Sequence, residues 1–252
     1  MQFFKTHHFT LAIATIISIS LISLVSAAHH GSQMESGFQS LFNGKDLTGW
    51  SGNPKLWSVQ DGAITGKTGD TPETKLTHNT FLVYTTDSVD DFELRLKYRI
   101  VNGNSGIQYR SKILEEGEFG PIIGGYQADF EAGTKYSGIL YEEKGRRILA
   151  LRGQITKIIS DPANPETPKI EVVGSVGDTA EIQTVIKSED WNEYTIIANG
   201  NQFTHLINGR VTATAIDEDY ANSSKSGVLA LQIHAGPVMT VQFKDVRLRP
   251  IR

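Results

Sequence analysis

The chain of 252 residues contains no cysteine, so no disulfide can stabilise the fold and burial of apolar side chains must do so. It also lacks a His-x-x-x-His pair, an EF-hand loop, a Ser-His-Asp signature and a phosphate-binding glycine loop. The sequence therefore contains no metal-binding motif, and we expect the protein to require no cofactor. They also give no support to serine-hydrolase or nucleotide-binding chemistry.

Clustered positive charge is equally lacking. The chain has 24 Lys and Arg against 28 Asp and Glu, a formal net charge of −4, and its basic residues are scattered. Nucleic acid and anionic membrane surfaces are therefore poor partners. The composition instead suits a neutral, polar ligand.

The only long apolar run lies at the N-terminus, over residues 9–25. Lys5 precedes it and the small residues Ser26, Ala27 and Ala28 follow, which is typical of a secretory signal peptide. We expect a signal over 1–27, a polar lead-in over 28–37, and an exported protein, periplasmic or extracellular, that leaves the membrane after cleavage. A retained anchor is the alternative, whereas a lipoprotein anchor is excluded because no Cys follows the run.

Residues 38–252 alternate between apolar and polar with the period of two that is typical of β-strands. The clearest case is 91–101, where five apolar side chains alternate with four charged ones. The other expected strands are 57–59, 63–65, 81–84, 106–111, 125–130, 138–142, 147–151, 192–199, 201–208, 210–216, 227–234 and 238–248. About 220 residues with no repeat predict one all-β domain, a sandwich of two antiparallel sheets.

Helical signals are nearly absent. One helix is expected over 179–187, with Asp178 as its N-cap and Glu181 completing a capping box. Residues 160–169 hold three Pro and no periodicity, which predicts a surface loop. The wider segment 153–190 is interpreted as an insertion, either a lid, a dimer contact or neither.

Two strands carry unusual polar rows. Gln108 and Arg110 share one face of the first expected strand, and Gln127, Asp129 and Glu131 share one face of the second. Alternate strand residues lie about 6.5–7 Å apart, so each row could bind several hydroxyl groups at once. This pattern favours a sugar ligand; the alternative is a charged, solvated outer face.

An ordered set of short motifs resembles the 3-keto-disaccharide hydrolase domain family. It opens with Leu41-Phe42-Asn43-Gly44-Lys45-Asp46-Leu47-Thr48-Gly49-Trp50 and continues through Asn104-Ser105-Gly106-Ile107 and Gly125-Tyr126-Gln127 to Leu231-Gln232-Ile233-His234. The matches span residues 38 to 249. The resemblance implies a concanavalin-like jelly roll with a groove across one sheet, and an activity on glycosides whose sugar carries a ketone at C3.

One departure from the related glucanases bears on mechanism. Those enzymes use a Glu-x-Asp-x-(x)-Glu strand in which the outer carboxylates act as nucleophile and general acid. The equivalent segment here begins with Gln127, and an amide cannot act as that nucleophile. Retaining hydrolysis of an ordinary glucan is therefore disfavoured.

A 3-ketone makes the C2 hydrogen acidic, so the site needs a base, hydrogen-bond donors for the enolate oxygen and an acid for the leaving oxygen. His234 is the first candidate because it shares the polar face of its strand with Gln232; a strand-end surface histidine is the alternative. His205 is the second, although its apolar neighbours equally predict a buried core residue. Arg110 is the candidate donor and Asp129 a further catalytic candidate, with a structural ion pair between them as the alternative.

The remaining candidates would bind substrate. They are Gln108, Gln127, Glu131, Tyr141, Glu142, Gln232 and Trp50. Consecutive strand residues face opposite ways, so only one of Tyr141 and Glu142 is expected in the groove, and Trp50 could equally be core. Jelly rolls of this type sometimes hold a structural Ca²⁺, which the Asp and Glu content permits.

The sequence thus predicts an exported enzyme that cleaves a small 3-keto-glycoside by elimination and hydration, or by direct hydrolysis. A non-catalytic carbohydrate-binding module on the same sandwich is the main alternative, and a scaffold domain a third. The aglycone, the anomeric preference and the oligomeric state stay open.

Overall fold

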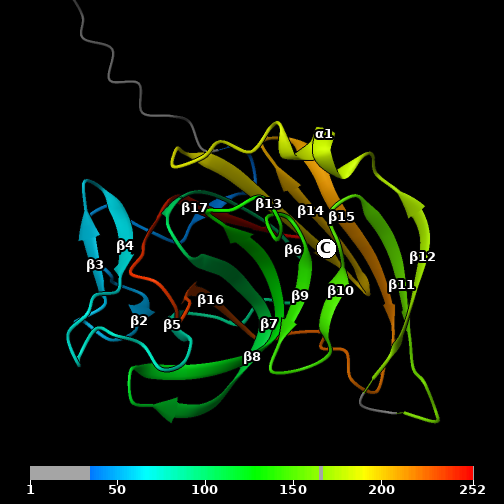
Figure 1. Ribbon diagram of the computed structural model, residues 1–252, viewed down its shortest axis with the longest axis horizontal. Helices are drawn as coiled ribbons and strands as arrows, with labels where there is room; N and C mark the ends of the chain where they lie inside the picture. Colours follow the sequence, from blue (N-terminus) through cyan, green and yellow to red (C-terminus); the bar gives the residue numbers. More distant parts are fainter. Residues whose placement is uncertain (1–34, 165–166, 252) are drawn as a thin grey trace, which may run out of the picture. The chain divides into compact units, whose positions relative to one another are not determined.

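The computed structural model describes residues 35–164 and 167–251. The expected signal peptide over 1–27 and most of the expected lead-in over 28–37 lie outside the described residues. The described part contains seventeen strands and one short helix (Figure 1). The all-β prediction is confirmed.

The strands form two sheets. In spatial order, the ten-stranded sheet contains β12 (Lys169–Ser175), β11 (Gln154–Ile159), β15 (Arg210–Glu218), β14 (Gln202–Ile207), β13 (Asn192–Asn199), β6 (Phe92–Val101), β17 (Thr240–Pro250), β4 (Ala63–Lys67) and β3 (Trp57–Gln60), with β1 (Gln39–Ser40) paired to β17. The seven-stranded sheet contains β10 (Arg147–Ala150), β9 (Leu140–Glu143), β8 (Gly120–Glu131), β7 (Asn104–Gly117), β16 (Val228–Ile233), β5 (Thr80–Tyr84) and β2 (Trp50–Ser51). Every described strand pair is antiparallel except β11–β15, which is parallel.

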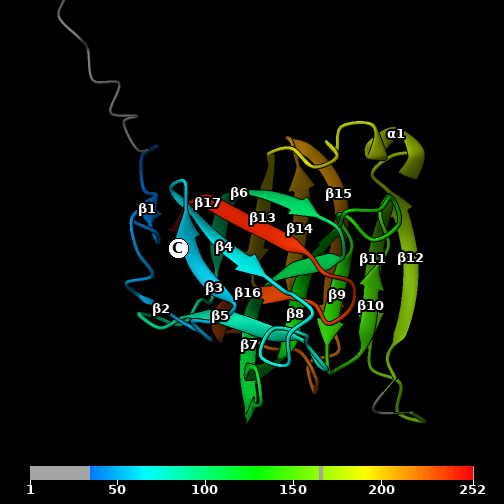
Figure 2. The same cartoon turned by 60° about the vertical axis from the view of Figure 1, so that its left-hand side comes forward.

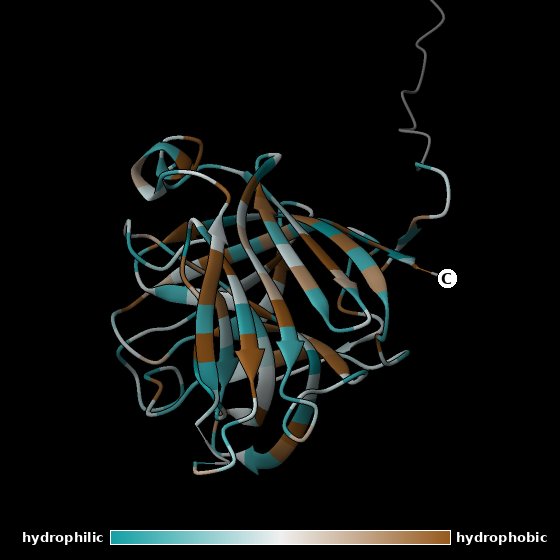
Figure 3. Ribbon diagram, turned by 90° about the vertical axis from the view of Figure 1, so that its right-hand side faces the viewer, coloured by the Kyte–Doolittle hydropathy of each residue, from teal (hydrophilic) through white to brown (hydrophobic). Residues whose placement is uncertain are grey.

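Alternation of side chains builds the core between the sheets. In β6, Phe92, Leu94, Leu96, Tyr98 and Ile100 are all buried, as the sequence predicts. Figure 3 shows the resulting bands of hydrophilic and hydrophobic residues along the strands. Because each strand buries one face, the opposite face of the seven-stranded sheet is free to carry polar groups.

Aromatic rings from both sheets join them. Tyr109 of β7 stacks on its register partner Tyr126 of β8, with ring centroids 5.7 Å apart, and Tyr126 packs 4.5 Å from Phe203 of β14. All three rings are buried. This contact across the layers holds β7 and β8 rigidly against the ten-stranded sheet.

Tight turns join neighbouring strands of the ten-stranded sheet. Asn208 and Gly209 join β14 to β15 with φ of 49° and 78°, and Gly200 joins β13 to β14 with φ of 57°. In the Asn208-Gly209 turn, positive φ at both central residues suits the right-handed twist of paired strands. These turns bring β13, β14 and β15 together as consecutive neighbours.

The segment expected to be an insertion is part of the sheet. Residues 154–159 and 169–175 form β11 and β12, which extend the ten-stranded sheet beyond β15 (Figures 1 and 2). The helix α1 (Thr179–Gln183) starts where predicted, and Asp178 accepts bonds from the backbone N–H of Ala180 and Glu181, but it ends four residues early. None of the helices in the described ranges is long and apolar enough to cross a membrane.

Candidate functional site

The face of the seven-stranded sheet that points away from the core carries a pocket of about 290 Å³. Its position follows from strand parity, because Tyr126, Ala128 and Phe130 of β8 are in the core and the residues between them face outward. The pocket is lined by Asn79, Asn104, Gln127, Asp129, Tyr136, Ile139, Tyr141, Glu143, Ile148 and His234. We call it the carboxyl pocket because Asp129 and Glu143 both face it.

Cross-strand register brings these side chains together. Tyr141 of β9 is the register partner of Gln127, and Glu143 is the partner of Gly125, so all four lie on one face. His234 follows the last residue of β16, one pleat beyond Gln232. The structure therefore brings four of the predicted site residues to one pocket: Gln127, Asp129, Tyr141 and His234.

Three buried glutamines fix the floor of the carboxyl pocket. The Nε2 of Gln232 donates to Oε1 of Gln127 at 3.0 Å, and the side-chain amide of Gln108 lies 2.5 Å from the same oxygen. Gln127 then donates through Nε2 to the Asp129 carboxylate. Since its oxygen is already occupied, Gln127 presents its nitrogen to Asp129 and cannot rotate freely.

Gly106 leaves the space that Gln127 occupies. A Cβ at residue 106 would lie 2.5 Å from Cδ of Gln127. We expect Gly106→Ala to displace Gln127 and to destabilise the protein by about 1–3 kcal/mol, the usual range for overpacking. Thermal unfolding measures the loss.

Gly174→Ala on edge strand β12 is the matched control, since the nearest atom to its new Cβ is Cδ1 of Ile155 at 3.2 Å. Equal melting temperatures for Gly106→Ala and Gly174→Ala would contradict this account of the floor. A lower value for the first alone supports it.

Burial raises the pKa of both carboxyl groups of the pocket. Burial raises the pKa of Asp129 to about 7. The hydrogen bond from Gln127 opposes this rise, and the neighbouring Glu143 adds to it. Burial also raises the pKa of Glu143, and Asn79, Lys144 and His234 oppose that shift. The carboxyl group of Asp129 is therefore partly protonated near neutral pH, where an ordinary surface Asp is ionised.

His234 is held in a defined tautomer. Its Nδ1 lies 2.5 Å from the Ala235 carbonyl oxygen, which can only accept, so Nδ1 carries the hydrogen. In the neutral ring Nε2 then keeps its lone pair. A histidine in this state can act as a base.

Asn79 connects the two ends of the carboxyl pocket. Its Oδ1 accepts from the Ala235 N–H at 3.0 Å, and its Nδ2 donates to Glu143 Oε1 at 3.3 Å. The same side chain therefore positions the loop that carries His234 and the carboxyl group of Glu143. Nothing in the sequence around residue 79 indicated this contact.

Arg110 lies elsewhere, and the expectation that it shares a face with Gln108 is wrong. A bulge between Tyr109 and Lys112 gives Arg110 a φ of 47° and turns its side chain away. The guanidinium donates to the Asp90 and Gly200 carbonyls at 2.5 and 2.7 Å and pairs with Asp91 at 2.5 Å. Its ion-pair partner is thus Asp91 instead of Asp129.

His205 lies in the core, as its apolar neighbours indicated. It is 1% exposed, with Tyr109 OH 3.0 Å from Nε2 and the Ile139 carbonyl 3.1 Å from Nδ1. Burial lowers its pKa to about 4, so the ring is neutral at physiological pH. It does not line the carboxyl pocket.

Three predicted substrate-binding residues bind protein groups instead. Glu131 Oε1 accepts from the backbone N–H of Lys135 and Tyr136, which holds the loop that carries Tyr136 into the pocket. Glu142 pairs with Arg146, and Trp50 donates to the Leu41 carbonyl at 2.8 Å from a buried position. Of Tyr141 and Glu142, only Tyr141 lines the pocket.

Sequence reasoning missed Asn79, Asn104, Tyr136 and Glu143. Glu143 had a usable signal, because it stands two residues after Tyr141 on the same strand and therefore on the same face. The other three come from loops or strand ends, where alternation gives no information.

No set of three or more His, Asp and Glu side chains suited to a metal occurs in residues 35–164 or 167–251. The Ca²⁺ site that the resemblance permits stays a prediction, as does independence from a cofactor. The carboxyl pocket brings together one histidine, two carboxyl groups and several hydrogen-bonding side chains of the chain itself.

Comparisons with known proteins agree with this architecture. The chain is similar to two crystal structures of a "putative glycosyl hydrolase" from Parabacteroides distasonis ATCC 8503, one at 22% identity and TM-score 0.51, covering 86% of this chain and 94% of the other. The second has 17% identity and TM-score 0.51, covering 85% and 99%. A Bacillus subtilis protein of unknown function with a galectin-like fold has TM-score 0.53 at 10% identity, covering 81% and 90%. These likenesses establish the fold.

No curated protein matches the chain. The sequence profile of one domain family does, over residues 37–249, which is nearly the whole described structure and confirms the resemblance noted from the motifs. The family relates the protein to carbohydrate chemistry. The chain therefore belongs to the 3-keto-alpha-glucoside-1,2-lyase-like domain family.

Proposed function

We propose that the protein is an exported enzyme that cleaves the glycosidic bond of 3-keto-glycosides in the carboxyl pocket. The observation that supports this most directly is the juxtaposition of His234, with a free Nε2, and Asp129, whose pKa is raised to about 7. A base and an acid in one pocket are what elimination from a 3-keto sugar requires. A site that only binds sugar needs neither.

In the proposed reaction Nε2 of His234 removes the C2 proton, which the adjacent ketone makes acidic. The electron pair forms the C1–C2 double bond as the C1–O bond breaks, and Asp129 or Glu143 protonates the leaving oxygen. The Tyr141 hydroxyl, whose pKa burial raises, donates to the enolate oxygen. Water then adds across the double bond, with OH at C1 and H at C2, so the net reaction is hydrolysis.

The amide at Gln127 supports this route over double displacement. Its Oε1 and Nε2 are both engaged within the protein, so it offers no nucleophile to C1. Its contribution is to orient Asp129. Direct hydrolysis by an activated water is the competing route, and it would produce no unsaturated intermediate.

The test is incubation of the protein with a 3-keto-glucoside and, separately, with the unoxidised glucoside, followed by mass spectrometry. We expect cleavage of the keto sugar alone, with a transient unsaturated product. For His234→Gln we expect kcat to fall about 10²- to 10⁴-fold, the range for loss of a general base, with an unchanged melting temperature.

His78→Gln is the matched control, because His78 lies outside the carboxyl pocket. Full activity of His234→Gln would remove this residue from the mechanism. Binding of the keto sugar without any turnover would favour the alternative function, a carbohydrate-binding module.

A further inference from the structure

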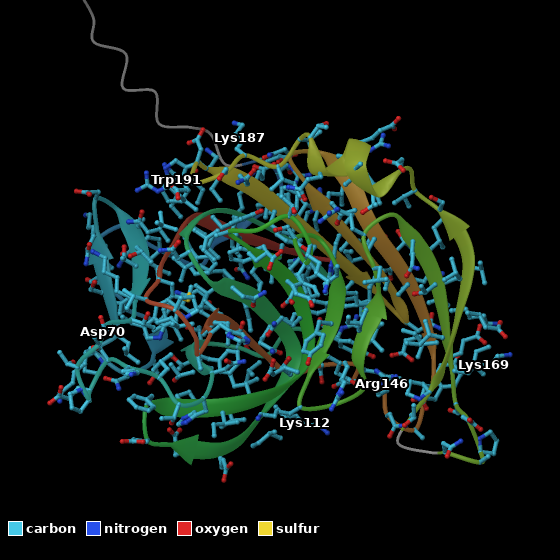
Figure 4. All side chains as sticks on the ribbon, viewed as in Figure 1. Asp70, Lys112, Arg146, Lys169, Lys187 and Trp191 are labelled. Carbon is cyan, nitrogen blue, oxygen red and sulfur yellow. The ribbon has the colours of Figure 1, made fainter. Side chains whose placement is uncertain are left out.

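Two buried arginine side chains stand on either side of β10, and they differ in how their charge is compensated. Arg146 precedes the strand and is paired with three carboxylates; Figure 4 labels it toward the lower side of the ribbon. Arg152 follows the strand, is 9% exposed, and forms no ion pair with any residue that the structure describes. A cation buried without a counter-ion is costly, so its position needs an explanation.

Arg152 binds the backbone of one loop. Its Nη1 donates to the Ser137 carbonyl at 2.8 Å and its Nη2 to the Thr134 carbonyl at 2.6 Å. Its Nε donates to the Thr179 carbonyl of α1 at 3.3 Å. The planar guanidinium thus ties residues 132–139, which join β8 to β9, to the helix. We call these residues the tyrosine loop.

The tyrosine loop is also held from the end of β8. Glu131 Oε1 accepts from the backbone N–H of Lys135 and of Tyr136, at 2.6 and 2.9 Å. The hydroxyl group of the buried Ser137 accepts from the Glu131 N–H at 3.0 Å. A loop with this many internal bonds is formed before any ligand arrives, so binding need not order it.

The loop directs Tyr136 and Ile139 into the carboxyl pocket. Tyr136 is half-buried, and Lys135 Nζ lies 4.8 Å from the centroid of its ring. Because Lys135 covers one face of the ring, the opposite face is the one left for a ligand.

The carboxyl pocket has an apolar side and a polar side. Ile148 comes from β10, next to the tyrosine loop, whereas Asn104 comes from β7 and His234 follows β16, both beyond β8 in the order of strands. A sugar ring has the matching form, with C–H groups on its faces and oxygen atoms at its rim. These C–H groups carry partial positive charge, and the face of an aromatic ring is negative.

We propose that the ring of Tyr136 is the surface on which the keto sugar stacks, and that Arg152 is a positioning residue that holds this ring in place. The proposal rests on the proposed function for the identity of the sugar. The ligand class is a pyranose that presents a C–H face to Tyr136 while its oxygen atoms face the polar side of the pocket.

The test measures KM and kcat for methyl 3-keto-glucoside. We expect KM to rise about tenfold in Tyr136→Ala, the effect of losing one aromatic contact. Tyr136→Phe keeps the ring and should keep the wild-type KM. Tyr220→Ala is the matched control, because Tyr220 is 68% exposed and lies outside the carboxyl pocket.

A double-variant cycle tests the role of Arg152. Arg152→Met should raise KM about as much as Tyr136→Ala does, and it should have no further effect on KM in the Tyr136→Ala background. Arg152→Lys keeps a cation without the planar fork and should recover part of the affinity; it replaces Arg152→Met in the cycle if that variant does not fold. Arg99→Met is the control, because Arg99 also bonds a neutral partner, Gln242 Oε1 at 3.1 Å, and lies outside the carboxyl pocket.

An unchanged KM in Tyr136→Ala overturns the stacking contact. A tenfold rise in Tyr136→Phe also overturns it, because the hydroxyl group would then be the part that binds. Independent, additive effects of the Arg152 and Tyr136 variants overturn the positioning role. If wild type binds the keto sugar without cleaving it, the proposed function fails, and calorimetric affinities of the same variants decide this inference. Absence of binding to wild type overturns both.

Discussion

Replacing Asp129 by Asn is expected to lower kcat for a 3-keto-glycoside by about 10²- to 10⁴-fold, because an amide cannot protonate the leaving oxygen. Wild-type activity should fall as pH rises through about 7, where Asp129 loses its proton. Gln127→Leu removes the hydrogen bond that lowers the pKa of Asp129, so this falling limb should move to higher pH. The measurement is kcat against pH for wild type, Asp129→Asn and Gln127→Leu. An unchanged falling limb in Gln127→Leu would contradict its assignment to Asp129.

Asp129→Asn should also stabilise the fold in alkaline solution. The folded pKa of Asp129 lies above its unfolded value of 3.8, so the folded state binds the extra proton and stability falls as pH rises from about 4 to about 7. A shift of this size corresponds to up to about 4 kcal/mol. Asp129→Asn should therefore unfold at higher temperature than wild type at about pH 9, with the difference vanishing at about pH 4. No gain at high pH would mean that Asp129 titrates normally.

Arg146→Met is expected to have the largest effect on stability. The Arg146 side chain is 3% exposed and bonds Glu142 of β9, Asp217 of β15 and Asp219, both aspartates being fully buried. Tyr126 also donates to Asp217 at 2.5 Å. Removing this cation leaves three carboxylates in a low-dielectric site, which costs about 3–5 kcal/mol.

Denaturant unfolding near neutral pH measures this loss. Lys157→Met, which breaks the half-exposed Lys157–Glu218 pair, is the control and should cost no more than about 1 kcal/mol. Combining Arg146→Met with Glu142→Gln, Asp217→Asn and Asp219→Asn should recover much of the lost stability, because no uncompensated charge then remains buried. Similar losses of unfolding free energy in Arg146→Met and Lys157→Met would show that Arg146 and its three carboxylate partners are hydrated.

Alternation predicted most of the sheets correctly because each central strand buries one face against the other layer. It did not identify β11 and β12. In β12 the burial pattern has no strict period, and Val172 and Val173 are both more than half exposed, since this strand lies at the edge of the ten-stranded sheet. β12 therefore offers no two-residue pattern to read, whereas β11 buries only Thr156 and Ile158 and its alternation is short.

The site could be predicted only where it follows the pleat. Gln127, Asp129 and Tyr141 were placed correctly because their strands are regular. Arg110 was placed wrongly because a single bulge reverses the parity after Tyr109, and bulges leave little trace in sequence. Asn79 touches Ala235 across 156 residues of chain, a contact that no local pattern encodes.

The position of β17 in the ten-stranded sheet determines when this fold can form. β17 contains residues 240–250 and lies between β6 and β4, and it also pairs with β1. Strand β1 and the paired strands β3 and β4 thus join the sheet only through β17, which lies much later in the chain. During synthesis these strands can join the sheet only after β17 has left the ribosome, and we expect cooperative folding to require residues 240–250.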